Sequence, residues 1–321
     1  MAQTRIADVI IPEVFADYVT KETMEKNALF DSGIMTPNQL INEFLAGGGT
    51  TVNLPYWTVI SGSDEVLSDA RALTPGSNKA AEQVAIRLLR GKAWSTNELA
   101  GVFAGDDPMG AIVKQVGAWW KSRQQQILLS VAKGVFDGPL ATTHVNDIST
   151  NSGAAAVISA DATLDTKQLL GDAADQITAV MMHSATKTAL QKQNLIETIP
   201  NARGEVAFQT YLGYRIIIDD NMPVNAGVYD TYFFRAGAIG YGDAKPVGLT
   251  EVETDRDSLA GVDYLMHRKS MCLHPEGLSF VGTGLVDPTP NNTELATGAN
   301  WAVAHEDKKE VGLLCLRHKL A

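Results

Sequence analysis

The sequence predicts an α+β fold, because its helical and extended segments are segregated along the chain and do not alternate. Two further features support this reading. A polar, alternating stretch from Gly47 to about Ser95 has no hydrophobic core of its own, and a long helical pattern from Pro108 to Val135 follows it. A segment that cannot fold alone implies a surface on which it packs, which favours an assembly subunit over an enzyme.

The composition is that of a globular protein with roughly two lobes, since the chain has 321 residues and domains average about 150. Hydrophobic residues make up 45% of the chain, charged residues 20%, and the net charge is -11. This charge argues against a protein that grips nucleic acid through a cationic surface. The sequence has no apolar run near the roughly 18 residues that span a bilayer and no signal peptide, so no membrane is expected. Cys272 and Cys315 are expected to be buried thiols.

Residues 1–46 show helical spacing in two short pieces. One apolar face lies within 14–19 and another within 40–45, and Ser32-Gly33 and Thr36-Pro37 interrupt the pattern between them. We expect an arm that lies on neighbouring surfaces and not an independent domain.

The next segment predicts a long hairpin loop. Two extended stretches, Thr50–Trp57 and Glu82–Trp94, flank a connection that is rich in Ser, Gly, Asp and Ala. An isolated two-stranded ribbon is marginally stable, and a long connection without its own core is generally functional. We therefore expect this loop to be ordered by another subunit.

The long helix has clear start and stop signals. Asp107 is suited to the N-cap, Pro108 to the first helical position, and Gly138-Pro139 ends the pattern. The apolar residues at helical spacing are Ile112, Val116, Trp119 or Trp120, Ile127, Val131 and Val135. From Pro108 to Val135 the helix would be about 42 Å long at about 1.5 Å per residue.

Downstream, Asp165 with Gln168 in the capping-box position predicts a helix that continues to Met181. Ser184 predicts the cap of a third helix, which ends before Ile199-Pro200. The rest of the chain has the patterns of strands. They are expected at 206–211, 214–218, 231–235, 247–253, 262–268 and 311–317.

No motif for a nucleotide or a catalytic nucleophile is complete. Gly47-Gly48-Gly49 lacks the Lys-Ser/Thr pair of a phosphate loop, so a hinge is favoured. The stretch 277–281 (GLSFV) ends in valine where a nucleophile elbow needs a small residue. Asp219 and Asp220 are adjacent and would point to opposite faces of a strand. We predict no catalytic and no cofactor-binding residues.

His267, Cys272 and His274 are the best candidates for a metal site. Strand geometry puts only Cys272 and His274 on one side, and no fourth ligand stands at a diagnostic spacing, so ordinary core positions are favoured and no metal is predicted. Trp119 and Trp120 have few basic neighbours. They are expected to be one core and one interface residue rather than a nucleic-acid stacking platform.

The order of several sequence blocks carries information about the family. They are the stretch from Gly47 to Pro108, the helix DPMGAIVKQVGAWWKSRQQQILLSVAKGVFDG, and the later strings AVMMHSATKTALQKQNLIE, YRIIIDDNMP, YDTYFFRAGAIGYGD, TDRDSLAGVDYLMHRKSMCLHPEGLSF and NWAVAHEDKKEVGLLCLRHKLA. In this order they resemble the major capsid proteins of tailed bacteriophages. The resemblance covers nearly the whole chain and implies the HK-ninety-seven-like capsid fold.

The resemblance also implies a division of the chain. The parts are an N-terminal arm (1–46), an E-loop (47–95), a P-domain with the long helix as its spine (96–160), an A-domain (161–248) and a return to the P-domain with some A-domain strands (249–321). Such subunits build the hexamers and pentamers of an icosahedral shell around double-stranded DNA. The expected location is the virion capsid, after synthesis in the host bacterial cytoplasm.

In such a shell, contacts between subunits are expected in the E-loop and at its base. The candidates are Trp57, Asp64, Glu65, Leu67, Asp69, Arg71, Lys79 and Trp94. Some relatives cross-link a lysine to an asparagine of a neighbouring subunit. In this chain Lys79 would be the donor and Asn291 or Asn292 the acceptor.

The implied partners are further copies of the chain, a portal, a decoration or cement protein, and packaged DNA by non-specific proximity only. A separate scaffolding protein is also expected, and cleavage of this chain is not, because the arm before the E-loop is short. Two alternatives remain open at this point. One is an encapsulin-like nanocompartment shell of the same fold, and the other is a soluble hydrolase that uses the region of Ser279 or Asp219.

Overall fold

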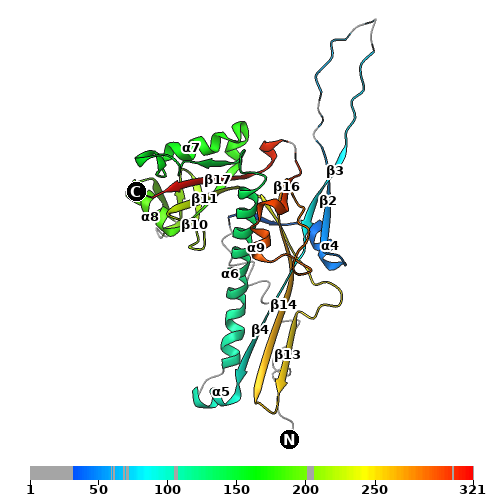
Figure 1. Ribbon diagram of the computed structural model, residues 1–321, viewed down its shortest axis with the longest axis vertical. Helices are drawn as coiled ribbons and strands as arrows, with labels where there is room; N and C mark the ends of the chain where they lie inside the picture. The colour runs from blue at the N-terminus through cyan, green and yellow to red at the C-terminus, as the bar shows by residue number, and fades with distance from the viewer. Residues whose placement is uncertain are drawn as a thin grey trace.

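The computed structural model describes residues 32–58, 60, 62–67, 69, 72–104, 108–200, 206–305 and 307–320. The molecule is elongated (Figure 1). A ribbon of paired strands projects from one end, the long helix and the strands beside it run toward the other, and a second sheet with its helices stands to one side. The first piece of the predicted arm, within 14–19, lies outside the described residues.

One sheet lies beside the long helix, and we name it the spine sheet. Its strands are β1 (Met35–Pro37), β4 (Leu88–Asn97), β12 (Ile239–Asp243), β13 (Val252–Asp257) and β14 (Val262–Pro275). Strand β14 is central, because it pairs antiparallel with β4, β12 and β13, while β1 pairs parallel with β12. This sheet joins residues that are more than 150 positions apart in sequence, such as Trp94 and Leu265.

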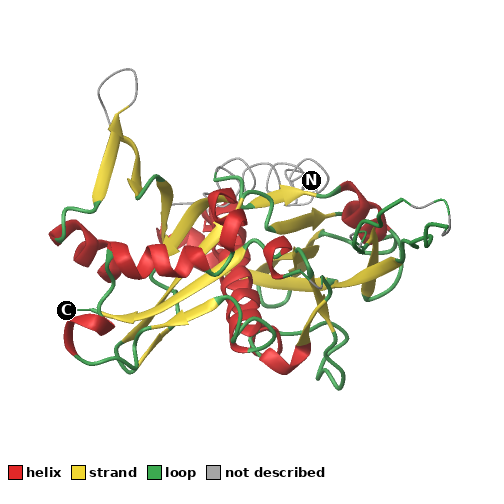
Figure 2. Ribbon diagram, turned by 90° about the horizontal axis from the view of Figure 1, so that it is seen from above, coloured by secondary structure: helices red, strands yellow, loops and turns green. Residues whose placement is uncertain are grey.

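The second sheet, which we name the side sheet, has the order β5-β17-β11-β6-β9-β8-β7, with β10 on β11. The strands are β5 (Val145–Asp147), β6 (Ile177–Met182), β7 (Ile196–Pro200), β8 (Val206–Tyr211), β9 (Tyr214–Ile218), β10 (Val224–Asn225), β11 (Val228–Arg235) and β17 (Leu313–Lys319). Helices α7 (Ala160–Gln168) and α8 (Ser184–Lys192) accompany it. In the view from above (Figure 2) it stands to one side of the long helix.

The side sheet is buried on both faces. Along β11, Tyr232 and Phe234 pack into the main core with the long helix, whereas Phe233 between them packs into a second core on the opposite face. This follows from the two-residue period of a strand. It explains why the sequence there is a continuous apolar run instead of an alternation.

Helix α6 (Pro108–Asp137) confirms the predicted long helix and extends it by two residues. Asp107, the predicted N-cap, lies outside the described residues. Trp120 is fully buried, and Trp119 is half-buried with its ring 5.3 Å from that of Trp94. Both tryptophans thus pack within the chain. Near the C-terminal end, Gly134 lets the chain cross closely, because a Cβ there would lie 2.1 Å from the Leu295 carbonyl oxygen.

The predicted helix from Asp165 to Met181 is wrong in most of its length. Helix α7 begins at Ala160 with Ser159 as its N-cap and ends at Gln168, and residues 177–182 form strand β6. Gly171 has φ +60°, a left-handed conformation that a helix cannot continue through. Four consecutive residues of β6, from Ala179 to Met182, are buried, and a run buried on both faces has no period that separates strand from helix.

Other elements agree more closely with expectation. Strands β8 and β9 have the predicted bounds, and α4 (Gln39–Ala46), capped by the Asn38 side chain, contains the apolar face expected within 40–45. The strand expected at 247–253 begins only at Val252, since Val247 lies in an exposed loop. The short elements are α5 (Glu98–Ala104), β15 (Leu278–Phe280), α9 (Asn292–Leu295), β16 (Trp301–Val303) and the 3₁₀ turns Gly153–Ala156, Gly171–Gln176, Gly298–Asn300 and Lys308–Glu310.

Candidate subunit interface

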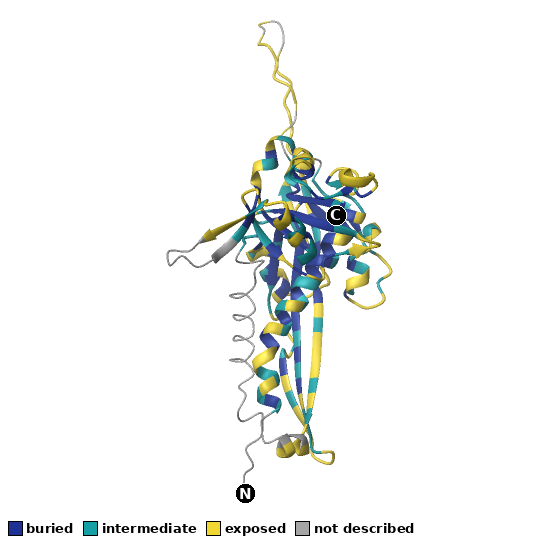
Figure 3. Ribbon diagram, turned by 90° about the vertical axis from the view of Figure 1, so that its left-hand side faces the viewer, coloured by how far each residue is buried: buried dark blue, intermediate teal, exposed yellow. Residues whose placement is uncertain are grey.

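The projecting ribbon consists of β2 (Thr51–Trp57) and β3 (Ala80–Ile86), which pair antiparallel with Trp57 opposite Ala80. The described residues beyond Trp57 form the connection, and they are exposed almost throughout (Figure 3). Large apolar side chains are among them: Leu67 is 79% exposed and Val66 82%. Exposed apolar side chains on a segment without a core are typical of a surface that is buried on association.

Most predicted contact residues lie together on this ribbon. Trp57 is 70% exposed at the end of β2, and the other exposed members are Asp64, Glu65, Leu67, Asp69 and Lys79. Glu65 closes the loop across its tip, because its Oε2 accepts from the Thr74 N–H at 3.2 Å. Arg71 lies outside the described residues.

Lys79 and Trp94 differ from the rest of the set. Lys79 directly precedes β3, and its carbonyl accepts from the Thr58 N–H at 2.9 Å, so it stands at the start of the paired strands rather than near the tip. Trp94 is half-buried against the core of its own chain in the middle of β4. Asn291, one proposed cross-link acceptor, caps α9, and its side-chain oxygen accepts from the Glu294 N–H.

Polar contacts fasten the root of the ribbon to the body. The Tyr56 hydroxyl donates to the Ala304 carbonyl at 2.6 Å, and the Val84 N–H donates to the Ser279 hydroxyl at 3.1 Å. Arg87, directly after β3, donates through Nη2 to the carbonyls of Phe44, Leu45 and Gly47 at 3.0, 3.0 and 2.8 Å. The three contact groups come from segments that are distant in sequence, so sequence patterns alone gave no signal for them.

The arginine also answers a local need of the fold. The last carbonyls of a helix have no partner inside the helix, and a cation near them is favoured by the helix dipole. Arg87 supplies both a hydrogen-bond donor and a positive charge to the C-terminal end of α4, and it is 6% exposed. Arg87 therefore ties the end of α4 to the root of the ribbon, in addition to the contacts of Tyr56 and Val84.

The residues weighed as chemical sites have structural partners. Asp219 accepts from the Gln125 side-chain nitrogen at 2.7 Å, whereas Asp220 accepts from the Ser184 N–H at 3.2 Å, so the two carboxylates serve different neighbours. Helix α8 starts at Ser184, but its N-cap is His183, whose Nδ1 accepts from the Ala185 N–H.

Burial also shifts the pKa values of the three candidate metal ligands. It raises the pKa of the Cys272 thiol to about 12 and lowers the pKa values of His267 and His274 to about 4. Among the described residues, no group of three or more His, Cys, Asp or Glu side chains could hold a metal ion. In the same part of the chain, no helix has the length and apolar character needed to cross a bilayer.

Comparison with known proteins decides the family. A family model described as major capsid protein 13-like (Gp13-like) matches residues 129–314. The major capsid protein of Bacillus phage SPP1 is 38% identical over 327 residues, which cover 100% of this chain and 99% of that protein. The chain belongs to the major capsid protein 13-like family. It is a phage capsid protein and not an enzyme, which decides against the hydrolase and the nanocompartment alternatives.

Solved structures agree on the fold of this capsid protein. The capsid of Ralstonia phage GP4 matches with a TM-score of 0.59 at 9% identity over 92% of each chain. The cyanophage Pam1 capsid matches with a TM-score of 0.55 at 12% identity over 90% of this chain and 91% of that chain. At such identities the likeness shows the fold alone, and it confirms the predicted α+β, HK-ninety-seven-like capsid fold.

The end of the capsid protein opposite the ribbon carries apolar surface that the sequence reasoning missed. Helix α5 exposes Leu99, Val102 and Phe103, the last at 87%, and Leu259 in the β13–β14 turn is 100% exposed. The two elements adjoin, because the Glu98 N–H donates to the Gly261 carbonyl at 2.9 Å. The apolar pair Val102-Phe103 just before the predicted Asp107 cap was the available signal.

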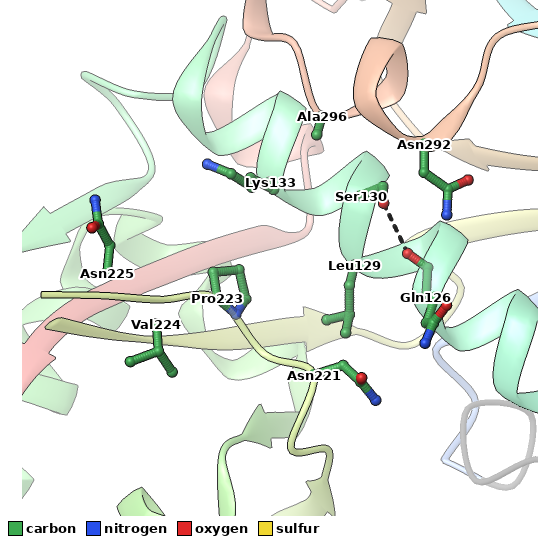
Figure 4. Close-up of a pocket in the computed structure, with 10 residues that line it drawn as sticks. All are labelled: Gln126, Leu129, Ser130, Lys133, Asn221, Pro223, Val224, Asn225, Asn292 and Ala296. Carbon is green, nitrogen blue, oxygen red and sulfur yellow. Dashed lines mark hydrogen bonds between the residues drawn. The ribbon is translucent and has the colours of Figure 1, made fainter. Parts of the chain in front are cut away.

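A groove of about 490 Å³ runs between α6 and the segment that leads into β10 (Figure 4). Its lining residues are Gln126, Leu129, Ser130, Lys133, Asn221, Pro223, Val224, Asn225, Asn292 and Ala296. It is open, its lining mixes apolar side chains with amides, a hydroxyl and one lysine, and it has no cluster of convergent charges. This lining has no feature of a catalytic site.

Proposed function

We propose that this capsid protein builds the hexamers and pentamers of an icosahedral shell, and that its E-loop is the main joint between neighbouring copies. One observation supports the joint above the others. The loop between β2 and β3 projects from the body while exposing Trp57, Val66 and Leu67, which a lone subunit would leave in water. Burial of a large apolar side chain contributes roughly 1.5–3 kcal/mol, so a few such contacts per subunit stabilise a closed shell.

The contact set remains the one expected from the sequence, with one difference of role, at Trp94. Trp57, Asp64, Glu65, Leu67, Asp69 and Arg71 are proposed to touch the next subunit. Trp94 is proposed to act indirectly, by holding β4 against α6 through Trp119. A cross-link from Lys79 to Asn291 or Asn292 of a neighbour would appear as a ladder of covalent oligomers on denaturing electrophoresis of mature particles.

The capsid domains can be assigned to the two sheets. In this proposal the spine sheet with α6 is the P-domain and the side sheet is the A-domain. The boundaries expected from the sequence then change at four elements. Strand β5 pairs within the side sheet, and β1, β4 and β12 pair within the spine sheet. Residues 145–147 therefore join the A-domain, and 35–37, 88–97 and 239–243 join the P-domain, while β17 is one of the A-domain strands expected within 249–321.

The remaining proposed partners follow from the family and from charge. A separate scaffolding protein, a portal and a decoration or cement protein would act with the shell, which is made in the host bacterial cytoplasm. Packaged double-stranded DNA would lie near the inner wall without specific contacts. A net charge of -11 favours a wall to which DNA does not adhere during filling.

Deletion of residues 61–79 tests the joint. The variant should fold, because β2 and β3 keep their pairing and their root contacts, but it should not form closed shells in negative-stain electron microscopy. A matched control replaces 61–79 with a Gly/Ser linker of equal length. This linker restores the length of the loop but not its side-chain contacts, so the control should also fail to form closed shells. Closed shells of normal size from either variant would contradict the proposal.

A further inference from the structure

A buried polar network lies at the root of the E-loop. Gln83 in β3 is 7% exposed, and its side-chain amide contacts two imidazoles. Its Oε1 is 3.0 Å from His274 Nε2 near the end of β14, and its Nε2 is 2.7 Å from His305 Nε2 in the segment after β16. A single amide therefore joins the ribbon to two separate elements of the body.

The backbone fixes which way round this amide lies. The Gly277 N–H donates to Gln83 Oε1 at 3.1 Å, so the oxygen must face Gly277. His274 Nε2 donates to the same oxygen. Gln83 Nε2 is a donor, so His305 Nε2 accepts and carries no proton. The proton of neutral His305 then stands on Nδ1, which is 2.8 Å from Glu310 Oε2.

The Gln83 NH₂ group meets an acceptor on His305 only while Nε2 of that ring carries no proton. A proton on His305 Nε2 would face the Gln83 NH₂ group at 2.7 Å, which brings two donors together. Turning the amide over removes that conflict but points its NH₂ group at the Gly277 N–H. His274 could shift its own proton between its ring nitrogens, but a backbone N–H cannot change from donor to acceptor.

The two imidazoles have different surroundings. Burial lowers the pKa of His274 to about 4, so it stays neutral well below pH 6. The titratable groups that face His305 are Tyr56 from β2, with ring centroids 4.3 Å apart, His274 from β14, and Glu310 from the turn before β17. The Glu310 carboxylate lies 2.8 Å from Nδ1 of His305, and the Gln83 amide lies 2.7 Å from Nε2 on the other side of the ring.

We propose that Gln83, His274 and His305 form a proton-operated latch that holds the E-loop root to the β14–β15 turn and releases it when His305 is protonated. Release would weaken the Val84–Ser279 and Gly277–Gln83 contacts together. The E-loop could then change its angle to the body. Only the consequence of that movement for shell assembly rests on the proposed function. The latch itself does not, because the network lies within one subunit.

Hydrogen exchange on the purified, unassembled full chain tests the latch. Amide protection is compared between pH 8 and pH 5.5, the range in which imidazoles titrate, after correction for intrinsic exchange rates. Protection of the Val84 and Gly277 amides should fall by about tenfold or more on acidification, as expected when a buried donor loses its acceptor. Amides of β6 in the side sheet serve as the internal reference.

Two variants separate the latch from a general effect of acid. Gln83→Glu offers carboxylate oxygens to Gly277, His274 and a protonated His305 at once, so its protection at pH 5.5 should hold or rise relative to the β6 amides. His305→Gln cannot be protonated at this position, so protection of its Val84 and Gly277 amides should fall no more on acidification than that of the β6 amides. The proposal is overturned if the wild-type amides keep their protection at pH 5.5, or if either variant loses it as the wild type does. Shell formation plays no part in this readout, so the latch and the E-loop joint can fail separately.

Discussion

Arg87→Ala should loosen α4 and the E-loop root together. Three carbonyls lose a charged donor, but the energetic cost differs between them because their remaining partners differ. The Phe44 carbonyl keeps the Gly47 N–H at 3.1 Å, and Gly47 is exposed, so water can replace the arginine there. The buried Leu45 carbonyl bears most of the loss. One orphaned buried acceptor costs about 1–3 kcal/mol, and the lost helix-dipole contact adds about 0.3–1, so we expect a destabilisation of about 1.3–4 kcal/mol.

The assay is urea unfolding of the unassembled chain followed by tryptophan fluorescence, with limited proteolysis at 47–49 as a local readout. Arg87→Lys should recover only part of the loss, since the lysine side chain is shorter and does not bring its ammonium group to the position of Nη2, from which all three contacts are made. Arg256→Ala is the matched control. Arg256 is half exposed and pairs with Glu98 and Asp263 at the surface, so its removal should cost less than about 1 kcal/mol. Equal costs for Arg87→Ala and Arg256→Ala would refute this reasoning.

Three further predictions concern packing, pH and assembly. Gly134→Ala should destabilise the chain by about 1–3 kcal/mol in urea unfolding, because the methyl group overlaps the Leu295 carbonyl. The free energy of unfolding should fall as the pH drops from about 6.5 toward 4. Burial lowers the pKa values of His267, His274 and His318 to about 4, so the unfolded chain takes up protons before the folded chain does. Each of these histidines contributes about 1.4 kcal/mol per pH unit. Trp57→Ala should leave subunit stability nearly unchanged and weaken assembly, whereas Trp94→Ala should lower subunit stability by about 3 kcal/mol.

Each of these has its own control. Gly48→Ala adds a methyl group where nothing lies within 4 Å, so it should be close to neutral. His267→Phe should reduce the slope of stability against pH by about a third if three imidazoles contribute equally. An unchanged slope would show that burial of His267 does not depress its pKa. For the tryptophans, the reasoning fails if Trp57→Ala lowers the unfolding midpoint as much as Trp94→Ala does.

Local patterns predicted the fold where the chemistry is local. The hairpin of β8 and β9 was placed correctly, because two short stretches rich in β-branched and aromatic residues flank Leu212-Gly213, and both of these residues adopt positive φ in the turn. Helix α6 was placed correctly because proline and glycine mark its ends. Strand β6 was missed since a strand buried on both faces shows no period of two.

The interface was predictable only in part, for a similar reason. An apolar side chain on a polar loop, such as Leu67, can be recognised from the sequence. The root contacts of that loop cannot, because Gln83 meets His274 and His305 at separations of 191 and 222 residues. Trp94 illustrates the limit, since a large aromatic residue near the loop reads equally well as an interface residue or as a core residue. Only the fold brings it to Trp119.

A reconstruction of the assembled shell by cryo-electron microscopy tests the central claim most directly. The account predicts that residues 58–79 of each subunit lie on the body of the neighbouring subunit, with Trp57 and Leu67 buried in that contact. A shell in which this loop points into solvent and touches no neighbour would contradict it.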